Sequence, residues 1–159
     1  MILYTSQMID YLIFWWQSSN EHGVHSPYVF RYLTRGLYGL SKKYEASKPY
    51  RLALSTIDYF SMSSVYCSDP KLSLKINAVF PHVKLNSTGL YDMVIYRGTD
   101  EIDYSRLHKD TILLILKPQR KEVRSFLASD RFCLVIDFYN CLFLQNRTEQ
   151  RRQNFILRY

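Results

Sequence analysis

The 159-residue sequence predicts an α/β fold whose sheet is mostly parallel. Three observations support this prediction. Between Val65 and Ala128, short apolar runs typical of strands alternate with segments of helical periodicity. Ile112–Leu116 is a continuous apolar run, as expected for a strand that is covered on both faces. Near the C-terminus only Asn140-Cys141 separates two strand-like runs, which indicates an antiparallel hairpin.

Helices are expected before the first strand, and they span residues 2–17, 26–37 and 49–61. The second of these has the clearest start, because Ser26 is a good N-cap and Pro27 occupies the first helical position. Gly36 or Gly39 is expected to help end it, since glycine readily ends a helix. The polar stretch that separates it from the third helix is expected to be a loop, residues 41–49.

The rest of the chain is expected to alternate between strands and helices. The strands are predicted at residues 65–67, 83–85, 91–96, 112–116, 132–139, 142–145 and 155–157. The helical segments between them are predicted at 70–80, 104–109 and 121–128. The length suggests a single domain of residues 1–159, with an N-terminal helical extension (1–45) followed by the α/β sheet (50–159).

Composition narrows the class of protein. The formal net charge of +7 comes largely from Lys117–Arg124 and Arg147–Arg152. Such basic clusters usually lie on solvated faces of a protein. The alternative is a nucleic-acid-binding module, but the sequence contains no zinc-finger or RNP pattern that would support it. The cysteines Cys67, Cys133 and Cys141 are odd in number and lack a CxxC spacing, which favours neither a disulfide framework nor a zinc site. Free thiols fit a reducing cytoplasm.

The N-terminal segment is apolar around residues 11–16. No basic leader precedes it, so it is a poor signal peptide. Asp10 and Gln17 bound an apolar run that is too short to span a bilayer. We therefore expect a buried or dimer-forming helix and no transmembrane segment, with a position on a membrane surface as the alternative.

The crossover from the first strand into its helix, residues 63–70, contains no glycine. In open α/β sheets this crossover is where a cofactor usually binds. A close approach of the backbone to such a ligand generally requires glycine. The sequence therefore predicts the frame of a nucleotide-type fold without the loop that holds a nucleotide.

Three stretches of the sequence form distinctive motifs. The first is His22-Gly23-Val24-His25-Ser26-Pro27, continuing through Phe30. The second is Tyr91-Asp92-Met93-Val94-Ile95-Tyr96-Arg97-Gly98, and the third is Val135-Ile136-Asp137-Phe138-Tyr139 followed by residues 154–159. These motifs resemble the opening motif, the fourth strand and the tail of a group of methyltransferase-like proteins of Bacteroidetes, within the class I S-adenosylmethionine-dependent methyltransferases. The resemblance covers about residues 12–39 and 91–159.

The resemblance implies a Rossmann-like methyltransferase fold, whose parallel sheet ends in an antiparallel hairpin. Residues 86–90 are too few for the family's third strand and its helix, so the third strand is expected to be missing. The second strand then becomes an exposed sheet edge, which favours pairing. If a methyl-donor site is retained, the resemblance places it at Ser68, Asp69, Asn86, Arg97 and Gly98.

These positions depart from the family pattern. The family's first strand ends in an acid and a glycine-rich turn, where this chain has Tyr66–Pro70. Its second strand ends in an acid that binds the ribose, where Asn86 or Ser87 stands here. Its fourth strand ends in Asp-Gly, and here Arg97 replaces the acid. Lys117 follows the next strand, where acids are common in the family.

The changes of charge oppose binding of the donor, whose sulfonium is positive. At an effective dielectric constant of about 20, like charges ~5 Å apart repel by roughly 3 kcal/mol. We therefore expect no cofactor and no catalytic residue, and a non-catalytic methyltransferase-like protein that acts through protein–protein association. The alternatives are an S-adenosylmethionine-dependent methyltransferase with an altered site and the basic nucleic-acid-binding module. Association as a homodimer is expected through the N-terminal helices or the sheet edge.

Other candidate chemistry is weaker. His22 and His25 are spaced to share a metal, but nothing nearby completes a site, so a structural turn is favoured and no metal is expected. The acids Asp100, Glu101 and Asp103 suggest a solvated helix start rather than a cation site. Arg97 either binds an anion in the former cofactor cleft or pairs with a neighbouring acid, and pairing is the favoured interpretation.

Overall fold

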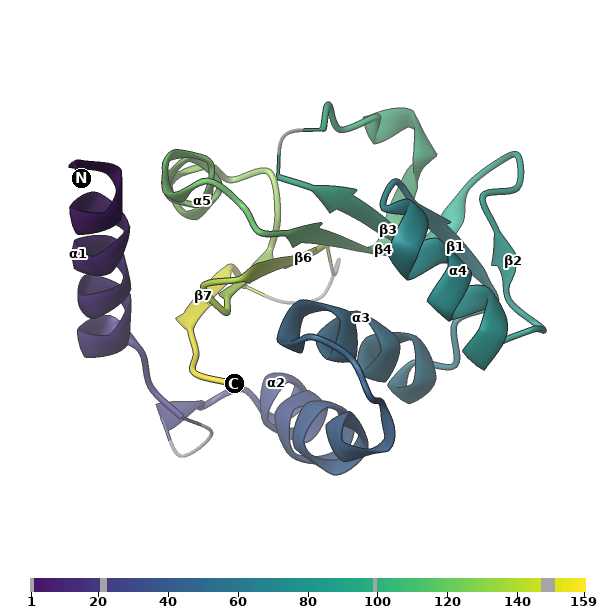
Figure 1. Ribbon diagram of the computed structural model, residues 1–159, viewed down its shortest axis with the longest axis horizontal. Coiled ribbons are helices and arrows are strands. Elements are labelled where there is room, and N and C mark those ends of the chain that lie inside the picture. Colours follow the sequence, from purple (N-terminus) through teal and green to yellow (C-terminus); the bar gives the residue numbers. More distant parts are fainter. Residues whose placement is uncertain (1, 21–22, 99, 147–150) are drawn as a thin grey trace.

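The computed structural model describes residues 2–20, 23–98, 100–146 and 151–159, with side chains from Gln7 onward (Figure 1). Within these residues the sheet has seven strands in the order β2-β1-β3-β4-β6-β5-β7. The strands are β1 (Ser64–Cys67), β2 (Lys84–Leu85), β3 (Tyr91–Arg97), β4 (Leu107–Leu116), β5 (Leu134–Asp137), β6 (Cys141–Gln145) and β7 (Gln153–Ile156). The α-helices are α1 (Ile2–Gln17), α2 (Pro27–Arg31), α3 (Lys48–Tyr59), α4 (Pro70–Val79) and α5 (Arg120–Ala128).

The sheet is mixed, and most of its strands run parallel. β2, β1, β3 and β4 pair in parallel, whereas β6 is antiparallel to both β4 and β5. β7 adds in parallel to β5 at the far edge. The α/β class and the C-terminal antiparallel hairpin are therefore confirmed.

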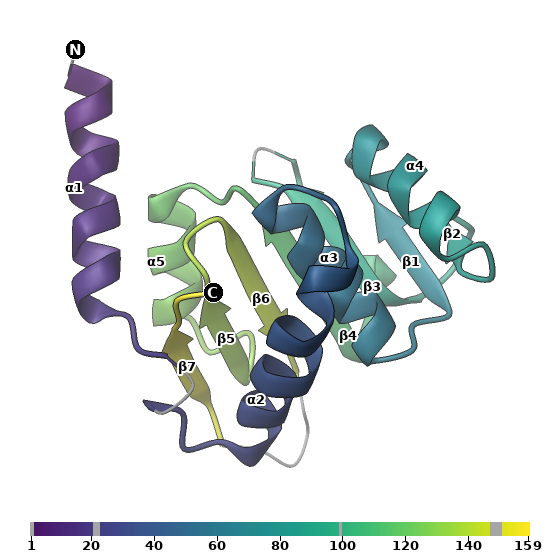
Figure 2. The same cartoon turned by 60° about the horizontal axis from the view of Figure 1, so that its bottom comes forward.

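Helices cover the two faces of the sheet unequally. α2, α3 and α4 pack on one face, around the largest buried cluster, which includes Tyr32, Leu54 and Phe143. α5 packs on the other face, where Val123 is fully buried against strand residues such as Leu144. Figure 2 shows α2 and α3 in front of the sheet and α5 behind it. This layering leaves the carboxyl ends of β1 and β3 at one rim of the sheet.

Local signals in the sequence explain where two of the helices begin. Ser26 caps α2, and its hydroxyl accepts a hydrogen bond from the Val29 backbone N–H at 3.5 Å. Asp69 caps α4, with Pro70 in the first turn where no backbone N–H is needed. Both helices were expected at these positions.

The predicted end of the second helix is wrong. The backbone stays helical past Gly36 and at Gly39, whose φ is −70°, and a π-helical segment spans Tyr32–Tyr38. A 3₁₀ turn, Ser41–Lys43, follows within the predicted loop. Gly36 serves packing instead, because a Cβ there would lie 3.0 Å from ring atoms of Tyr32 and Tyr59.

The predicted helical turn at 104–109 is also only partly right. A 3₁₀ turn spans Tyr104–Arg106, and β4 begins at Leu107. The strand starts early because Leu107 pairs with Tyr91 before a shift of register. The Thr111 hydroxyl bridges this irregularity by donating to the Tyr91 carbonyl at 2.6 Å.

β2 and α1 lie at opposite ends of the molecule (Figures 1 and 2). β2 forms the edge of the sheet, as expected from the short stretch that follows it. α1 stands beside the β7 end, and its connection to the body includes a parallel bridge between Ser19 and Leu157. Within the described ranges, no helix has the length and apolarity that crossing a membrane requires.

Candidate functional site

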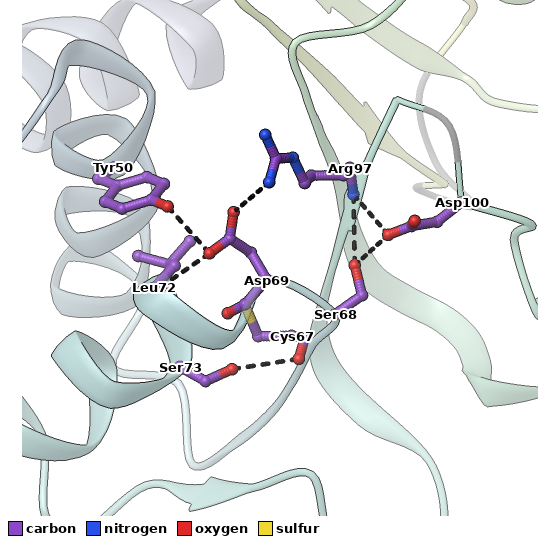
Figure 3. A network of polar contacts seen from close by, with 8 residues as sticks. All are labelled: Tyr50, Cys67, Ser68, Asp69, Leu72, Ser73, Arg97 and Asp100. Atoms are coloured by element: carbon purple, nitrogen blue, oxygen red, sulfur yellow. Dashed lines mark hydrogen bonds and ion pairs between the residues drawn. The ribbon is translucent and has the colours of Figure 1, made fainter.

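The topology marks one rim of the sheet as the candidate site. From β1 the chain passes through α4 to β2 on one side, and then returns to β3 on the other side of β1. The order of the strands reverses at this point, and ligands of open α/β sheets bind outside the carboxyl ends of the strands there. Ser68 and Asp69 follow β1, and Arg97 ends β3, so the fold brings these three expected residues together (Figure 3).

Asp69 lies at the centre of the crevice and is almost fully buried. Its Oδ1 accepts hydrogen bonds from the Leu72 backbone N–H at 3.0 Å and from the Tyr50 hydroxyl at 2.9 Å. Its Oδ2 lies 3.8 Å from a guanidinium nitrogen of Arg97 (Figure 3). Both carboxylate oxygens therefore have partners within the chain.

These contacts shift the acidity of the groups involved. Burial alone would raise the pKa of Asp69, but the Leu72 N–H, the Tyr50 hydroxyl and the Arg97 charge together hold that pKa below its usual value. Burial and the hydrogen bond to Asp69 raise the pKa of Tyr50 to about 12. At neutral pH the carboxylate is therefore ionised and the phenol keeps the proton that it donates.

Ser68 and the backbone of Arg97 form a second set of contacts. The Arg97 backbone N–H donates to Ser68 Oγ at 3.3 Å and to Asp100 Oδ2 at 3.1 Å. The Ser68 hydroxyl in turn donates to Asp100 (Figure 3). Asp100 thus closes the turn after β3, which corrects the expectation that it is a solvated acid. Asp103 does begin a helical turn, since it caps the 3₁₀ segment after it.

Asn86, expected at the ribose position, bonds to the chain instead. Its side-chain oxygen accepts from the Cys67 backbone N–H at 2.7 Å, and its amide nitrogen donates to the Cys67 carbonyl at 3.2 Å. The backbone of Asn86 is in the left-handed region, with φ at 51°. Asn86 therefore extends the pairing of β2 with β1, and its amide is engaged on both sides.

Gly98 is placed against a neighbouring backbone. A Cβ at this position would lie 2.4 Å from the Lys117 carbonyl oxygen. The Gly98 N–H donates to the Leu116 carbonyl at 2.9 Å. Lys117 itself has a φ of 50°, which turns the chain sharply at the end of β4. The glycine is thus required for the packing of two strand ends.

Two spaces of different size lie at this rim. The crevice beside Asp69 and Arg97 has a volume of about 170 Å³ and is also lined by Tyr50 and Lys117. Pockets for small molecules usually measure ~300–1,000 Å³. A wider, open hollow of about 620 Å³ lies across α4 between Ser68 and Asn86, and no charged residue lines it. Neither space offers a free carboxylate for the hydroxyls of a ribose.

Sequence reasoning missed Tyr50 and Asp100 as members of this network. Pro49 indicated that a helix starts next to Tyr50, but nothing in the pattern shows that this helix start lies over the end of β1. Asp100 was seen only as part of an acidic run. Cys67, at the same crossover, is buried, and burial raises the pKa of its thiol, so it is not an activated nucleophile.

The remaining candidates are easily placed. His22 lies outside the described residues, and His25 is exposed. In the part of the chain that the structure describes, no cluster of histidine, cysteine or acidic side chains is arranged to hold a metal ion. Arg97 pairs with Asp69, which agrees with the favoured interpretation from the sequence.

Many basic side chains pair with acids. The described pairs are Lys43–Asp58, Arg97–Asp69, Arg106–Asp103, Arg120–Asp137 and Arg152–Asp130. Residues 147–150 of the second basic cluster lie outside the described ranges. A nucleic-acid interface therefore stays a prediction from charge.

Comparison of the chain with family models, with curated proteins and with solved structures found no match.

Proposed function

We propose that this chain is a shortened methyltransferase-like domain that does not use a methyl donor and acts by associating with another protein chain. The strand arrangement supports the methyltransferase-like part. β1 lies at a reversal of strand order, and the parallel strands end in an antiparallel hairpin, as the resemblance implies. β2 lies at the edge, where a shortened member of that family would lack its third strand.

The observation that carries the proposal is the set of partners around Asp69. We infer that the crevice beside Asp69 is closed to a donor by the chain's own contacts, since Tyr50, Leu72 and Arg97 all bind this one carboxylate. Arg97 lies beside Asp69, so the ion pair largely cancels its repulsion of a sulfonium. Closure of the crevice, rather than positive charge, is the main obstacle.

Opening the crevice has an energetic cost. A hydrogen bond to a charged group contributes about 1.5–3 kcal/mol, and the Tyr50–Asp69 bond is of this kind. Losing one such bond would weaken donor binding by roughly 10- to 150-fold. The uncapped turn of α4 would add to this loss. The closed network therefore opposes binding of a donor in this crevice.

A thermal-shift titration with S-adenosylmethionine and with S-adenosylhomocysteine tests the proposal. A ligand at a hundredfold excess over its dissociation constant stabilises a protein by about 2.7 kcal/mol. In a chain of this length that corresponds to a rise in melting temperature of roughly 5–10 °C. We expect no resolvable rise with either ligand at 1 mM, the level at which a site of ~10 µM affinity would give this full shift.

The same titration separates this proposal from the alternative, an active methyltransferase with an altered site. Saturable stabilisation at micromolar concentration would overturn the closed-crevice proposal. Adenosine serves as the control ligand, because it shares the nucleoside and lacks the sulfonium. Tyr50→Phe is the matched variant, since it removes one hydroxyl from the network and keeps the ring.

A further inference from the structure

Seven of the twelve large apolar side chains that are exposed on the described residues belong to α1. Its large side chains are between 48% and 82% exposed, and Trp16 is the most exposed. These side chains are Met8, Ile9, Tyr11, Leu12, Ile13, Trp15 and Trp16. The only charged residue of α1 is Asp10. A contiguous exposed surface of this kind marks an interaction site.

Four of the exposed residues form one helical stripe. Ile9, Leu12, Ile13 and Trp16 follow the i, i+3, i+4, i+7 spacing that places side chains on a single face. This is also the spacing of the anchors with which one helix binds another. We call these four residues the α1 stripe.

The opposite face of α1 holds the helix on the body. Phe14 is buried, and its ring lies 5.1 Å from the ring of Tyr139. Tyr11 makes an edge contact with the same ring at 5.0 Å, and the Tyr139 hydroxyl donates to the Gln7 carbonyl at 3.2 Å. The α1 stripe is therefore on the exposed side of the helix. Figures 1 and 2 show α1 at one end of the molecule, with the other elements on one side of it.

The area of this face matches the need of a stable interface. A fully exposed side chain of this size presents ~150–250 Å², so the four residues of the α1 stripe, which are 48–82% exposed, present roughly 350–600 Å². A standard interface buries ~800 Å² on each partner, of which ~56–65% is apolar. The α1 stripe of a second copy would supply the same apolar area on the other side of the interface.

We propose that the α1 stripe binds the α1 stripe of a second copy of this chain, which gives a two-fold symmetric dimer. This inference rests on the proposed function, since it names the partner and the surface for an association domain. Two-fold pairing places the same apolar residues of both copies against one another. Asp10 is only partly exposed and lies off the α1 stripe, so the Asp10 carboxylates of the two copies do not meet at the centre of the dimer interface.

Two other occupants are less favoured by the described residues. A helix that lies on an anionic membrane carries lysine or arginine along its polar side. α1 has only Gln7, Asp10 and Gln17 in the corresponding positions of its described part. Pairing through the sheet edge is limited because β2 is two residues long and begins with Lys84, features that protect an edge from pairing.

Sedimentation velocity over a range of protein concentrations tests this proposal. Wild type is expected as a dimer at micromolar concentration. Trp16→Glu places a charge in the α1 stripe and is expected to raise the dimer dissociation constant by at least about 30-fold. Leu74→Glu is the matched control, because Leu74 is 74% exposed on α4 near the β2 edge. It is expected to leave the dimer intact.

Tryptophan emission provides a second measurement. Both tryptophans of the chain are in α1. Dilution of wild type below the dissociation constant is therefore expected to shift the emission to longer wavelength, and Trp16→Phe retains Trp15 as the reporter. Circular dichroism of Trp16→Glu at wild-type intensity shows that the variant still folds.

Three results would overturn the α1 proposal. The first is that wild type sediments as a monomer at 100 µM. The second is that Leu74→Glu breaks the dimer and Trp16→Glu does not, and the third is that wild type is a monomer and binds vesicles of phosphatidylcholine and phosphatidylglycerol. None of them involves the methyl donor, so each is distinguishable from the failure of the closed crevice, which shows as donor binding. A dimer broken by Leu74→Glu would move the association to the sheet edge.

Discussion

Two regions of the molecule differ in whether their side chains have partners within the chain. They are the crevice at the ends of β1 and β3 and the outer face of α1. In the crevice, Asp69 binds Tyr50, Leu72 and Arg97, so the polar groups have partners within the chain. On the outer face of α1, apolar side chains up to 82% exposed have no such cover. The region that the topology marks for a ligand is closed, whereas a region outside the sheet is open.

This difference indicates which process is energetically favourable, opening the crevice to a ligand or covering α1 with a second chain. Opening the crevice means breaking charged hydrogen bonds that water only partly replaces. Covering α1 removes apolar area from water, which is favourable by ~25 cal/mol per Å². Association through α1 is thus the more favourable process, and each prediction below breaks or sharpens this contrast.

The largest effect is expected where α1 meets the body. Arg120 donates to both carboxylate oxygens of Asp137, at 3.1 and 2.6 Å, and Asp137 is fully buried. The guanidinium also lies 5.3 Å from the Tyr139 ring, which holds α1. Arg120→Ala leaves a buried charge unpaired, and we expect it to lower the free energy of unfolding by about 3–5 kcal/mol in urea denaturation.

Controls for this prediction come from the same helix. Lys121→Ala changes an exposed neighbour and is expected to alter stability by less than about 0.5 kcal/mol. Adding Asp137→Asn to Arg120→Ala removes the unpaired charge and is expected to restore part of the loss. A loss below about 1 kcal/mol for Arg120→Ala would contradict the structural role of the pair.

The crevice network should show the next largest effect. Asp69→Ala removes the N-cap of α4, worth about 1 kcal/mol, and the charged hydrogen bond from Tyr50, worth about 1.5–3 kcal/mol. We expect the free energy of unfolding to fall by about 2.5–4 kcal/mol. Asp130→Ala breaks an exposed ion pair with Arg152 and should cost less than about 1 kcal/mol. Equal losses for the two variants would mean that the crevice is not self-stabilised.

The pH dependence of stability sharpens the same point. The folded pKa of Asp69 is lowered, so its contribution is present above the unfolded pKa of about 4 and is lost as the pH falls through the folded value. The difference in unfolding free energy between wild type and Asp69→Asn is therefore expected to be largest at neutral pH. It should narrow below about pH 4, as urea denaturation at several pH values would measure. A difference that stays constant with pH would refute this role of the carboxylate.

The smallest effect is expected from salt. The proposed dimer interface is apolar, so raising NaCl from 0.1 to 0.5 M should change its dissociation constant by less than about threefold. A complex with nucleic acid behaves differently, since binding through 6–10 phosphates loses ~10³–10⁵ in affinity between 50 and 200 mM salt. Tight oligonucleotide binding at low salt that disappears in this way would favour the basic-module alternative.

The sequence predicted those parts of the fold that local signals determine. Ser26 was predicted as an N-cap and caps α2, and the helix predicted from Pro70 begins there, with Asp69 as its cap. The hairpin around Asn140 followed from two β-rich runs with a minimal connection. Leu107 escaped prediction because its strand pairing depends on Tyr91, a contact that no local pattern encodes.

The sequence predicted which positions belong to the candidate site but not the contacts that its residues make. The lack of glycine between residues 63 and 70 indicated that a nucleotide loop was missing. The partners of Asp69 depend on tertiary structure, because Tyr50 reaches it from another helix. The exposure of Trp16 was likewise not predictable, since an apolar N-terminal helix is compatible with burial in the core as well as with an open face.

The contrast between the two regions can be tested in one sedimentation velocity experiment with S-adenosylmethionine present, followed by adenine absorbance and by protein absorbance. The account predicts that the chain sediments at the mass of a dimer and that no adenine absorbance moves with it. Donor that sediments with the protein, at either mass, would contradict the closed crevice, and a monomer free of donor would contradict the open face of α1.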